Sequence, residues 1–400
     1  MSDYNYKCYS CGKTFDKDFI ENDFVYLCPE CGKAAKNKPL EGVLTVEYDY
    51  DRLKKEYSRE FFNSIPSGNL SLYPKLWPVD FNKISAGILE KLVLPSNQLL
   101  NYVLDGNEVI IQDETKNPTF SFKDRASILV ALKAIELGIE EIAAASTGNA
   151  GSSLAGICAR IGLKSKIYVP ENIPDAKRLQ IETYGSELVI VDGDYDLAFD
   201  TCLDDSIKNK YYNRNTAYNP LTIEGKKWGA YDIFINTKGN LPDNIFIPVG
   251  DGVIISGIYK GFYELKKLGL IDKLPRLIAV QSEGSRAVVD YLNEKEFEYK
   301  PAYTIADSIS AGAPRNLYMA ADAVEFTDGF AVAIEDDMIL KAQKEFIQST
   351  GILAEPSSAV TYAAFKKLSN NPEVKNGKNM LLITGNGLKD ISSLEKINSL

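Results

Sequence analysis

From about residue 110 onward, short apolar segments alternate with segments of helical spacing, and this alternation limits the possible fold more than any other feature of the chain. Strands that alternate with helices form parallel sheets with helices on both faces. The sequence therefore predicts an α/β fold whose ligand sites lie at the carboxyl ends of the strands. We expect strands at 109–113, 142–145, 166–169, 188–191, 245–249, 277–281, 330–334 and 380–384. We expect helices at 124–137, 152–161, 175–184, 195–210, 225–236 and in the segment that ends at 268.

The length and charge of the chain restrict its class and its partners. Four hundred residues suggest two or three structural units. A formal net charge of −10 argues against a general nucleic-acid partner. The first residues are polar and aromatic, and no apolar run approaches the roughly 20 residues that span a bilayer. We therefore expect a cytoplasmic protein that contacts neither nucleic acid nor membrane.

The chain contains no histidine, which restricts the chemistry open to it. Ser-His-Asp triads, His-ligated catalytic zinc and histidine general bases are all excluded. Proton transfer must come from Lys, Asp, Glu, Tyr, Cys or a cofactor.

Four of the six cysteines lie within the first 31 residues, in two Cys-x-x-Cys pairs that are each followed by glycine. Each pair places two thiolates on one cation, and the glycine allows the tight turn that brings backbone amides toward the sulfurs. Two unrelated redox pairs, or incidental thiols, are the alternative. We predict a zinc ribbon over residues 1–38, with a closed structural site made by Cys8, Cys11, Cys28 and Cys31. Cys158 and Cys202 are expected to be small buried residues.

Lys123 stands in the segment Asn-Pro-Thr-Phe-Ser-Phe-Lys-Asp-Arg, residues 117–125, between a predicted strand and a predicted helix. A cation at the start of a helix opposes the helix dipole and has no structural reason to be there. In an apolar setting beside Phe122 its pKa would fall, and the amine would be a competent nucleophile for an aldehyde. A plain surface charge is the alternative.

Three further loops, at 146–153, 248–257 and 384–390, each follow a predicted strand. Small residues in the first leave amides and hydroxyls able to wrap a carboxylate at a helix N-terminus. The glycines of the second can cradle a phosphate by the same physics, although the carboxylate of Asp251 should then point away from it. The third would place the hydroxyl of Thr384 at the sheet edge. Each loop alone is also compatible with an ordinary polar turn.

Together and in this order, these segments resemble the threonine synthase family within the fold type II pyridoxal-phosphate enzymes. The resemblance covers the chain from about residue 1 to 400 and is most specific at 118–125, 146–153, 351–358 and 383–390. It implies a tryptophan synthase β-like pair of parallel sheets beside the ribbon. The expected parts are a large cofactor-binding domain of residues 39–125 and 225–400 and a small domain of residues 126–224. The resemblance also implies a homodimer.

The resemblance implies a role for each residue that matches the family's motifs. Lys123 matches the lysine that holds pyridoxal 5'-phosphate as a Schiff base, and Asn149 the residue that hydrogen-bonds the phenolic oxygen. Thr384 matches the hydroxyl at the pyridine nitrogen. The loop for the cofactor phosphate matches Gly250, Asp251, Gly252, Val253 and Ile254. The substrate-binding candidates are Ser146, Thr147, Ser152 and Arg125.

Three departures from the family concern the substrate. The Gly-Glu-Gly-x-Thr-Pro stretch expected before the lysine motif is absent from residues 84–96. Phe120 replaces a glycine, which predicts a narrower pocket. Thr222 stands where the family has a phosphate-binding arginine, and the loss of that bidentate fork is not conservative. Arg125 and Lys227 are the candidates to compensate for it.

The function that the resemblance implies is a lyase reaction on an amino-acid substrate. Such an enzyme converts O-phosphohomoserine and water into threonine and phosphate. The departures keep open a β-replacement, a β-elimination or a dehydration of another activated hydroxy amino acid, such as O-phosphoserine. A non-catalytic binding protein descended from the enzyme is the third alternative.

Overall fold

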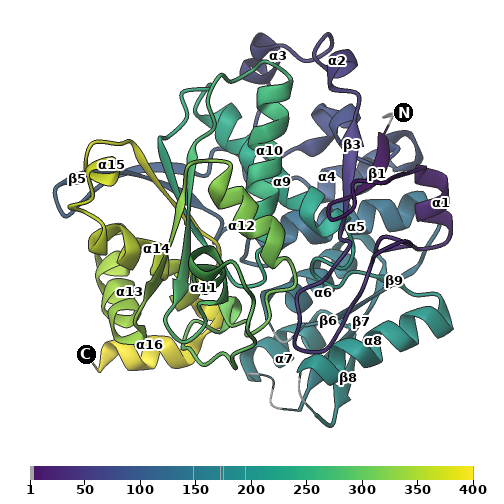
Figure 1. Ribbon diagram of the computed structural model, residues 1–400. Coiled ribbons are helices and arrows are strands. Elements are labelled where there is room, and N and C mark those ends of the chain that lie inside the picture. Colours follow the sequence, from purple (N-terminus) through teal and green to yellow (C-terminus); the bar gives the residue numbers. More distant parts are fainter. Residues whose placement is uncertain (1–3, 147, 172, 174, 194, 400) are drawn as a thin grey trace.

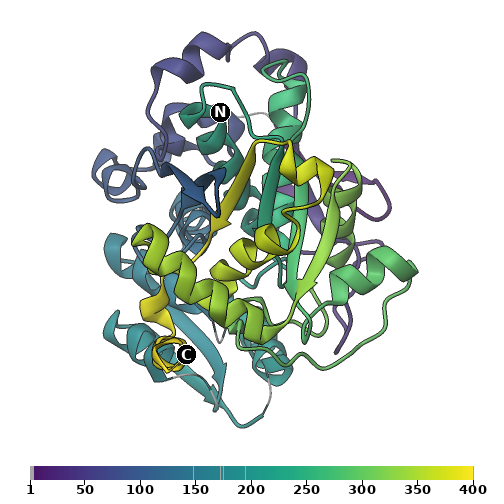
Figure 2. The ribbon, with the colours of Figure 1, turned by 90° about the vertical axis from the view of Figure 1, so that its left-hand side faces the viewer.

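Three β-sheets and the helices packed on them make up the described part of this computed structural model (Figure 1, Figure 2), which comprises residues 4–146, 148–171, 173, 175–193 and 195–399. Two of the sheets are built mainly from parallel strands with helices on both faces. This arrangement confirms the predicted α/β fold.

The largest sheet has six strands in the order β12-β11-β10-β13-β5-β4. All neighbouring strands are parallel except the edge hairpin of β4 and β5. Helices α13 and α14 pack on one face, and α10, α11 and α12 on the other (Figure 1). The strands are β4 (Leu99–Leu104), β5 (Asn107–Asp113), β10 (Asn244–Pro248), β11 (Arg276–Ser282), β12 (Phe330–Ile334) and β13 (Asn379–Ile383). The helices are α10 (Val253–Lys267), α11 (Ala287–Glu294), α12 (Leu317–Glu325), α13 (Asp336–Thr350) and α14 (Pro356–Lys367).

The second sheet has four parallel strands in the order β8-β7-β6-β9. Helix α8 packs against β6 and β7, and α6 and α7 also pack on this sheet. The strands are β6 (Glu141–Ala145), β7 (Lys164–Pro170), β8 (Glu187–Val191) and β9 (Tyr212–Asn213). The helices are α6 (Asn149–Ile161), α7 (Asp175–Thr183) and α8 (Tyr195–Asn209).

Three helices form the buried centre of the molecule: α5 (Lys123–Glu136), α9 (Leu221–Asn236) and α10. Two glycines of α10 let α9 approach closely. A Cβ added at Gly257 would lie 2.6 Å from the Cβ of Lys226, and one added at Gly261 would lie 2.6 Å from the Cβ of Ala230. Because both contacts advance together along the two chains, α9 and α10 run parallel, and their N-termini lie at the same end.

The N-terminal sheet is antiparallel, in the order β2-β1-β3. Its third strand comes after residue 38, where the sequence places the end of the ribbon, and pairs with β1 along its whole length. The sheet packs on the central helices, because Tyr48 donates to Glu224 at 3.1 Å and the amine of Lys133 donates to Tyr4 at 3.0 Å. Its elements are β1 (Tyr4–Cys8), β2 (Thr14–Phe15), α1 (Lys17–Asn22) and β3 (Leu44–Tyr48).

Short helices connect the N-terminal sheet to the six-stranded sheet, in a region where the sequence pattern gave no assignment. These are α2 (Tyr50–Leu53), α3 (Arg59–Ser64), η1 (Leu70–Leu72), η2 (Pro74–Leu76), η3 (Phe81–Lys83) and α4 (Ala86–Lys91). From residue 109 on, every predicted strand is present. The remaining elements are η4 (Asp307–Ile309), α15 (Pro372–Lys375), η5 (Gly387–Lys389) and α16 (Ile391–Asn398).

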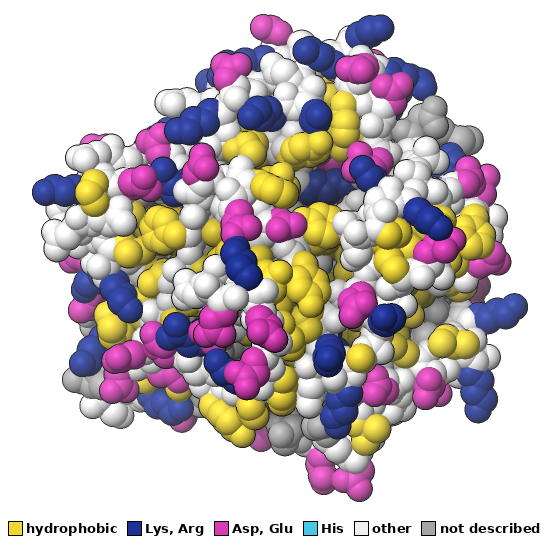
Figure 3. Space-filling view, in the orientation of Figure 1, with side chains coloured by type: hydrophobic (Ala, Val, Ile, Leu, Met, Phe, Trp, Pro, Cys, Tyr) yellow, Lys and Arg dark blue, Asp and Glu magenta, His cyan; other side chains and the backbone are white. Residues whose placement is uncertain are grey.

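Positive and negative side chains are interspersed on the face of the molecule shown in Figure 3. Within the described ranges, no helix combines the length and the apolar character that crossing a bilayer requires.

Candidate active site

Two of the segments singled out in the sequence meet directly at the carboxyl end of the six-stranded sheet. The amide of Phe122, just before Lys123, donates to the carbonyl of Thr384 at 2.8 Å. The amide of Asn386 donates to the carbonyl of Phe120 at 3.0 Å. The segment just before Lys123 is therefore fixed to the end of β13 by two backbone hydrogen bonds.

Lys123 is a partly exposed lysine at the first position of α5. Burial lowers the pKa of its amine to about 8. The carboxylates of Glu355 and Asp251 oppose burial, and the cations Arg214 and Lys177 lower the pKa of Lys123 further. At pH 7 roughly a tenth of an amine with this pKa is unprotonated, far more than at the usual lysine pKa of about 10.4, and only the unprotonated amine is a nucleophile.

Thr384 is held by a serine that the sequence reasoning did not assign. The hydroxyl oxygen of Ser358 accepts from the amides of Thr384 at 3.0 Å and of Gly385 at 2.8 Å. It also lies 3.2 Å from the hydroxyl oxygen of Thr384. Ser358 thus fixes both the backbone and the side chain of Thr384 at the sheet edge.

Asn149 begins α6 and contacts the buried carboxylate of Glu355, which lies just before α14. Its side-chain nitrogen donates to the two carboxylate oxygens of Glu355 at 3.0 and 3.1 Å. Its oxygen Oδ1 is buried and has no hydrogen-bond partner within the part of the chain that the structure describes. Burial raises the pKa of Glu355. Sequence reasoning missed Glu355, although it is the one carboxylate of the specific stretch 351–358.

The loop before α10 has the form of a phosphate cradle. Gly252 has φ +84°, and a Cβ added there would lie 2.7 Å from the Cβ of Ala320. The side chain of Asp251 accepts from the amide of Arg315 at 3.2 Å, which ties this carboxylate to the neighbouring segment. Val253 and Ile254 form the first turn of α10, where amides have no acceptor within the helix and can bind a phosphate.

The predicted substrate loop is placed only in part. Ser146 is buried, and its hydroxyl accepts from the amide of Gly148 at 3.2 Å. Thr147 lies outside the described residues. Ser152 is fully buried and accepts from the amine of Lys389 at 3.0 Å. Burial lowers the pKa of Lys389 to about 8.

The structure does not bring Arg125 and Lys227 to these loops. The guanidinium of Arg125 is fully buried and donates to Glu114 at 2.7 and 2.9 Å and to Asp232 at 2.7 Å. Lys227 forms ion pairs with Glu224 at 2.7 Å and with Glu264 at 3.0 Å. Because both cations are neutralised within the core, neither can replace an arginine at position 222.

The structure does not support the expectation that Phe120 narrows the pocket. Its backbone has φ +67°, a left-handed conformation that favours glycine. Its side chain is 44% exposed. The family's glycine at this position is therefore explained by the backbone turn, and phenylalanine is accommodated with its ring facing largely outward.

The four N-terminal cysteines converge, with all their sulfur atoms within 4.8 Å of one another. The sulfurs of Cys8 and Cys31 lie 3.5 Å apart and those of Cys11 and Cys28 lie 3.7 Å apart. Cys158 and Cys202 are buried in helices α6 and α8, as expected, and burial raises the pKa of each to about 12.

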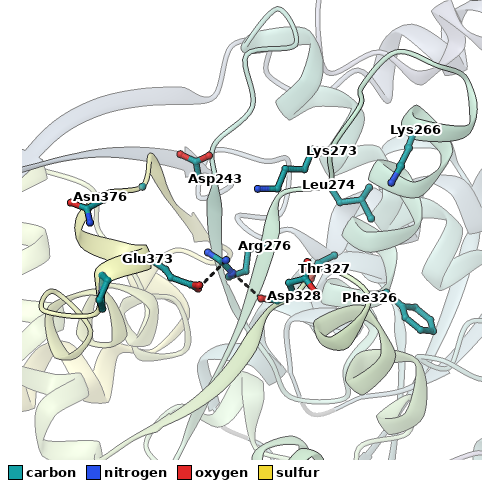
Figure 4. Close-up of a pocket in the computed structure, with 12 residues that line it drawn as sticks. Asp243, Lys266, Lys273, Leu274, Arg276, Phe326, Thr327, Asp328, Glu373 and Asn376 are labelled. Atoms are coloured by element: carbon teal, nitrogen blue, oxygen red, sulfur yellow. Dashed lines mark hydrogen bonds and ion pairs between the residues drawn. The ribbon is translucent and has the colours of Figure 1, made fainter.

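A surface hollow at the opposite edge of the six-stranded sheet is not the candidate site (Figure 4). It lies at the amino ends of β10 and β11, whereas ligands of parallel sheets bind at the carboxyl ends. Its central cation, Arg276, is engaged with Glu373 at 2.9 Å and with the carbonyl of Asp328 at 2.8 Å.

Comparisons with known proteins agree with this geometry. Residues 94–385 match the model of the family described as pyridoxal-phosphate dependent enzyme. Two solved structures show the same fold. Maize serine racemase is 17% identical with a TM-score of 0.64, and the match covers 81% of this chain and 98% of that one. A threonine deaminase from Solanum lycopersicum is 22% identical with a TM-score of 0.64, and the match covers 80% of this chain and 94% of that one. The chain is thus a pyridoxal-phosphate dependent enzyme.

Whole-length relatives narrow this class. The chain is 35% identical to the threonine synthase of Methanocaldococcus jannaschii, over 96% of this chain and 92% of the relative. It is 31% identical to that of Methanosarcina acetivorans, over 97% and 92%. It belongs to the threonine synthase family.

Proposed function

We propose that this enzyme converts O-phosphohomoserine and water into threonine and phosphate. The observation that carries the proposal is the position of Lys123, whose lowered pKa makes it a nucleophile and whose segment is bonded to the end of β13. The whole-length similarity to threonine synthases supports this substrate over the alternatives considered from the sequence.

The residues around Lys123 fit pyridoxal 5'-phosphate. Gly250, Gly252 and the first turn of α10 would hold its phosphate, and Thr384 would face its pyridine nitrogen. The buried oxygen of Asn149, which has no partner among the described residues, marks a place where a polar ligand atom is needed. The cofactor, when bound, supplies an electron sink for charge at the substrate carbons.

The protein's own groups would then position the substrate and move protons. Lys123 would bind the cofactor and would exchange protons at the α and β carbons of the substrate through its Nζ. Glu355 fixes the orientation of the Asn149 amide through two hydrogen bonds. Ser146 and Thr147 would bind the substrate carboxylate at the N-terminus of α6. We assign Ser152 and Arg125 to the support of the site, because both are fully buried and bonded within the protein.

Phosphate release tests the function. The cofactor-loaded enzyme should release inorganic phosphate from O-phosphohomoserine, with threonine as the product found by mass spectrometry. The Lys123→Ala variant should release none. A wild-type enzyme with full cofactor occupancy and no turnover would refute the proposal. Release from O-phosphoserine in place of O-phosphohomoserine would favour the β-elimination alternative.

We also propose that the four N-terminal cysteines bind one structural zinc ion. Four thiolates leave no open coordination position, so the site has no catalytic role. Because β3 pairs along the whole of β1, the strand that ends at Cys8, we extend the ribbon module from residue 38 to residue 48. Metal analysis should give one zinc per chain in the purified protein, and Cys11→Ser should lose it.

The remaining expectations stay proposals. The four-stranded sheet and its helices correspond to a small domain near residues 126–224, and the six-stranded sheet to the large domain. A homodimer rests on the family resemblance, and light scattering of the purified protein tests it. A cytoplasmic location rests on the reduced thiols that a four-cysteine metal site needs.

A further inference from the structure

Lys226 differs from the other buried lysines of the central helices. It is fully buried, and its amine has no hydrogen-bond partner within the described residues. Lys227, the next residue, forms two buried ion pairs, and Lys133 pairs with Glu21 and Glu136. A buried amine without a partner is costly unless a ligand completes its surroundings.

The position of Lys226 directs its amine toward the candidate active site. The residue lies on the second turn of α9, with its Cβ against Gly257 of α10. Helical side chains lean toward the N-terminus of their helix, so the amine extends toward the shared N-terminal end of α9 and α10. The phosphate loop of residues 250–252 lies at that end.

The charges near this amine are mainly positive. Lys123 and Arg214 lower the pKa of Lys226, after burial as the largest cause, and Asp251 acts in the opposite direction. The carboxylate of Asp251 already accepts from the amide of Arg315. An anion bound here would favour the protonated form of Lys226 and would also interact with Arg214, in surroundings that burial leaves poorly solvated.

Thr222 cannot provide this interaction, although it occupies the position of the family's arginine. Its hydroxyl donates to the carbonyl of Asn219 at 2.7 Å and accepts from the amide of Ala217 at 3.1 Å. Lys226 lies four residues later, so both side chains stand on the same face of α9.

We propose that Lys226 is the buried cation that binds a phosphate monoester in this site, in place of the arginine absent at position 222. Arg214 adds positive charge from the loop before α9, where it donates to Thr216 at 3.0 Å. The inference deepens the proposed function and rests on it for the identity of the substrate. Two phosphate monoesters are relevant, that of the cofactor and that of the substrate, and one set of experiments separates them.

The test compares Lys226→Met with wild type and with the control Lys133→Met. Lys133 is also fully buried, but it lies ten residues along α5 from Lys123, about 15 Å away along the helix axis. In the cofactor arm, apoenzyme is titrated with pyridoxal 5'-phosphate and with pyridoxal, and bound cofactor is followed by its visible absorbance. If the cofactor phosphate is the ligand, Lys226→Met should weaken only the phosphorylated form, by about 10- to 100-fold.

In the substrate arm, the KM for O-phosphohomoserine should rise about 10- to 100-fold with little change in kcat if the substrate phosphate is the ligand. Protection of the cofactor-loaded enzyme against heat by inorganic phosphate, which needs no turnover, should weaken in parallel. Loss in either arm, absent from Lys133→Met, supports the proposal. Unchanged values in both arms overturn it. If Lys226→Met weakens phosphate binding but the wild-type enzyme does not turn over O-phosphohomoserine, only the substrate assignment is refuted.

Discussion

Replacing Arg125 with methionine tests whether this arginine supports the core or binds substrate. Its side chain and those of its two acidic partners are at most 2% exposed. Three of its hydrogen bonds go to Glu114 and Asp232, and a fourth goes to Gln98 at 3.2 Å. Methionine keeps much of the volume but removes the charge, which leaves two carboxylates buried without their counter-ion.

The expected loss follows from these contacts. Breaking a buried ion pair by removing one partner costs about 3–5 kcal/mol, because the remaining charge stays desolvated. Burial already raises the pKa of Asp232 even with Arg125 beside it. Protonation of Asp232 in the variant limits the loss, so we expect a free energy of unfolding lower by about 3–5 kcal/mol. That is a large part of the roughly 5–15 kcal/mol typical of a folded protein.

Urea unfolding followed by circular dichroism measures this loss, and KM for O-phosphohomoserine is measured on the fraction that remains folded. We expect a lower unfolding midpoint and an unchanged KM. The matched control is Arg276→Met, whose partner Glu373 is half exposed, and which should cost no more than about 1 kcal/mol. A stability change below about 1 kcal/mol together with a raised KM would refute the structural role and restore Arg125 as a substrate ligand.

Three other predictions follow from the site and the ribbon. Only the unprotonated amine of Lys123 attacks an aldehyde, so the rate at which apoenzyme captures pyridoxal 5'-phosphate should rise with pH around a midpoint of about 8. Stopped-flow absorbance between about pH 6 and 10 measures this rate. A midpoint at the usual lysine pKa would contradict the prediction. Zinc removal by a chelator should weaken cofactor binding severalfold, because Arg315 connects the ribbon to the phosphate loop. Its guanidinium donates to the carbonyls of Ala35 and Lys38, and its backbone amide donates to the carboxylate of Asp251. Equal cofactor affinity in the zinc-free protein would argue against this connection. The Phe120→Gly variant should be more stable than Phe120→Ala by about 1 kcal/mol in urea unfolding, because only glycine adopts φ +67° without strain. Equal unfolding midpoints of the two variants would show that the turn relaxes.

Central strands such as β10 and β13 could be predicted because each is a continuous apolar run between turns, as parallel strands buried on both faces require. The N-terminal sheet could not be derived in the same way. Its third strand pairs with β1 across some forty residues of intervening chain, through Tyr4 with Tyr48 and Cys8 with Leu44. Such a pairing is set by tertiary contacts and leaves no local pattern.

In the candidate site, too, local motifs could be recognised in the sequence, whereas contacts between distant residues could not. Lys123 and Thr384 could be singled out as candidates because each directly adjoins a strand or helix end with a recognisable motif. The buried ion pair of Arg125 with Asp232 could not be predicted, because the two residues are 107 positions apart in the chain. The role of Glu355 depends on a contact 206 residues away. Lys226 and Lys227 are identical neighbours on one helix. Only their packing distinguishes the amine of Lys227, which forms ion pairs, from that of Lys226, which has no hydrogen-bond partner among the residues that the structure describes.

The attachment of the N-terminal sheet has a practical consequence for anyone who shortens this protein. A version trimmed to residues 94–385, the part that matches the family, would lack Tyr4, Val46 and Tyr48. It would expose Lys133, Lys260 and Glu224, which bond to those residues from within the core. It would also uncover the apolar cluster to which Tyr6, Leu44 and Val46 belong, and an exposed apolar surface of this kind favours aggregation on expression. The ribbon therefore cannot be removed or exchanged as an independent cassette unless the core beneath it is redesigned.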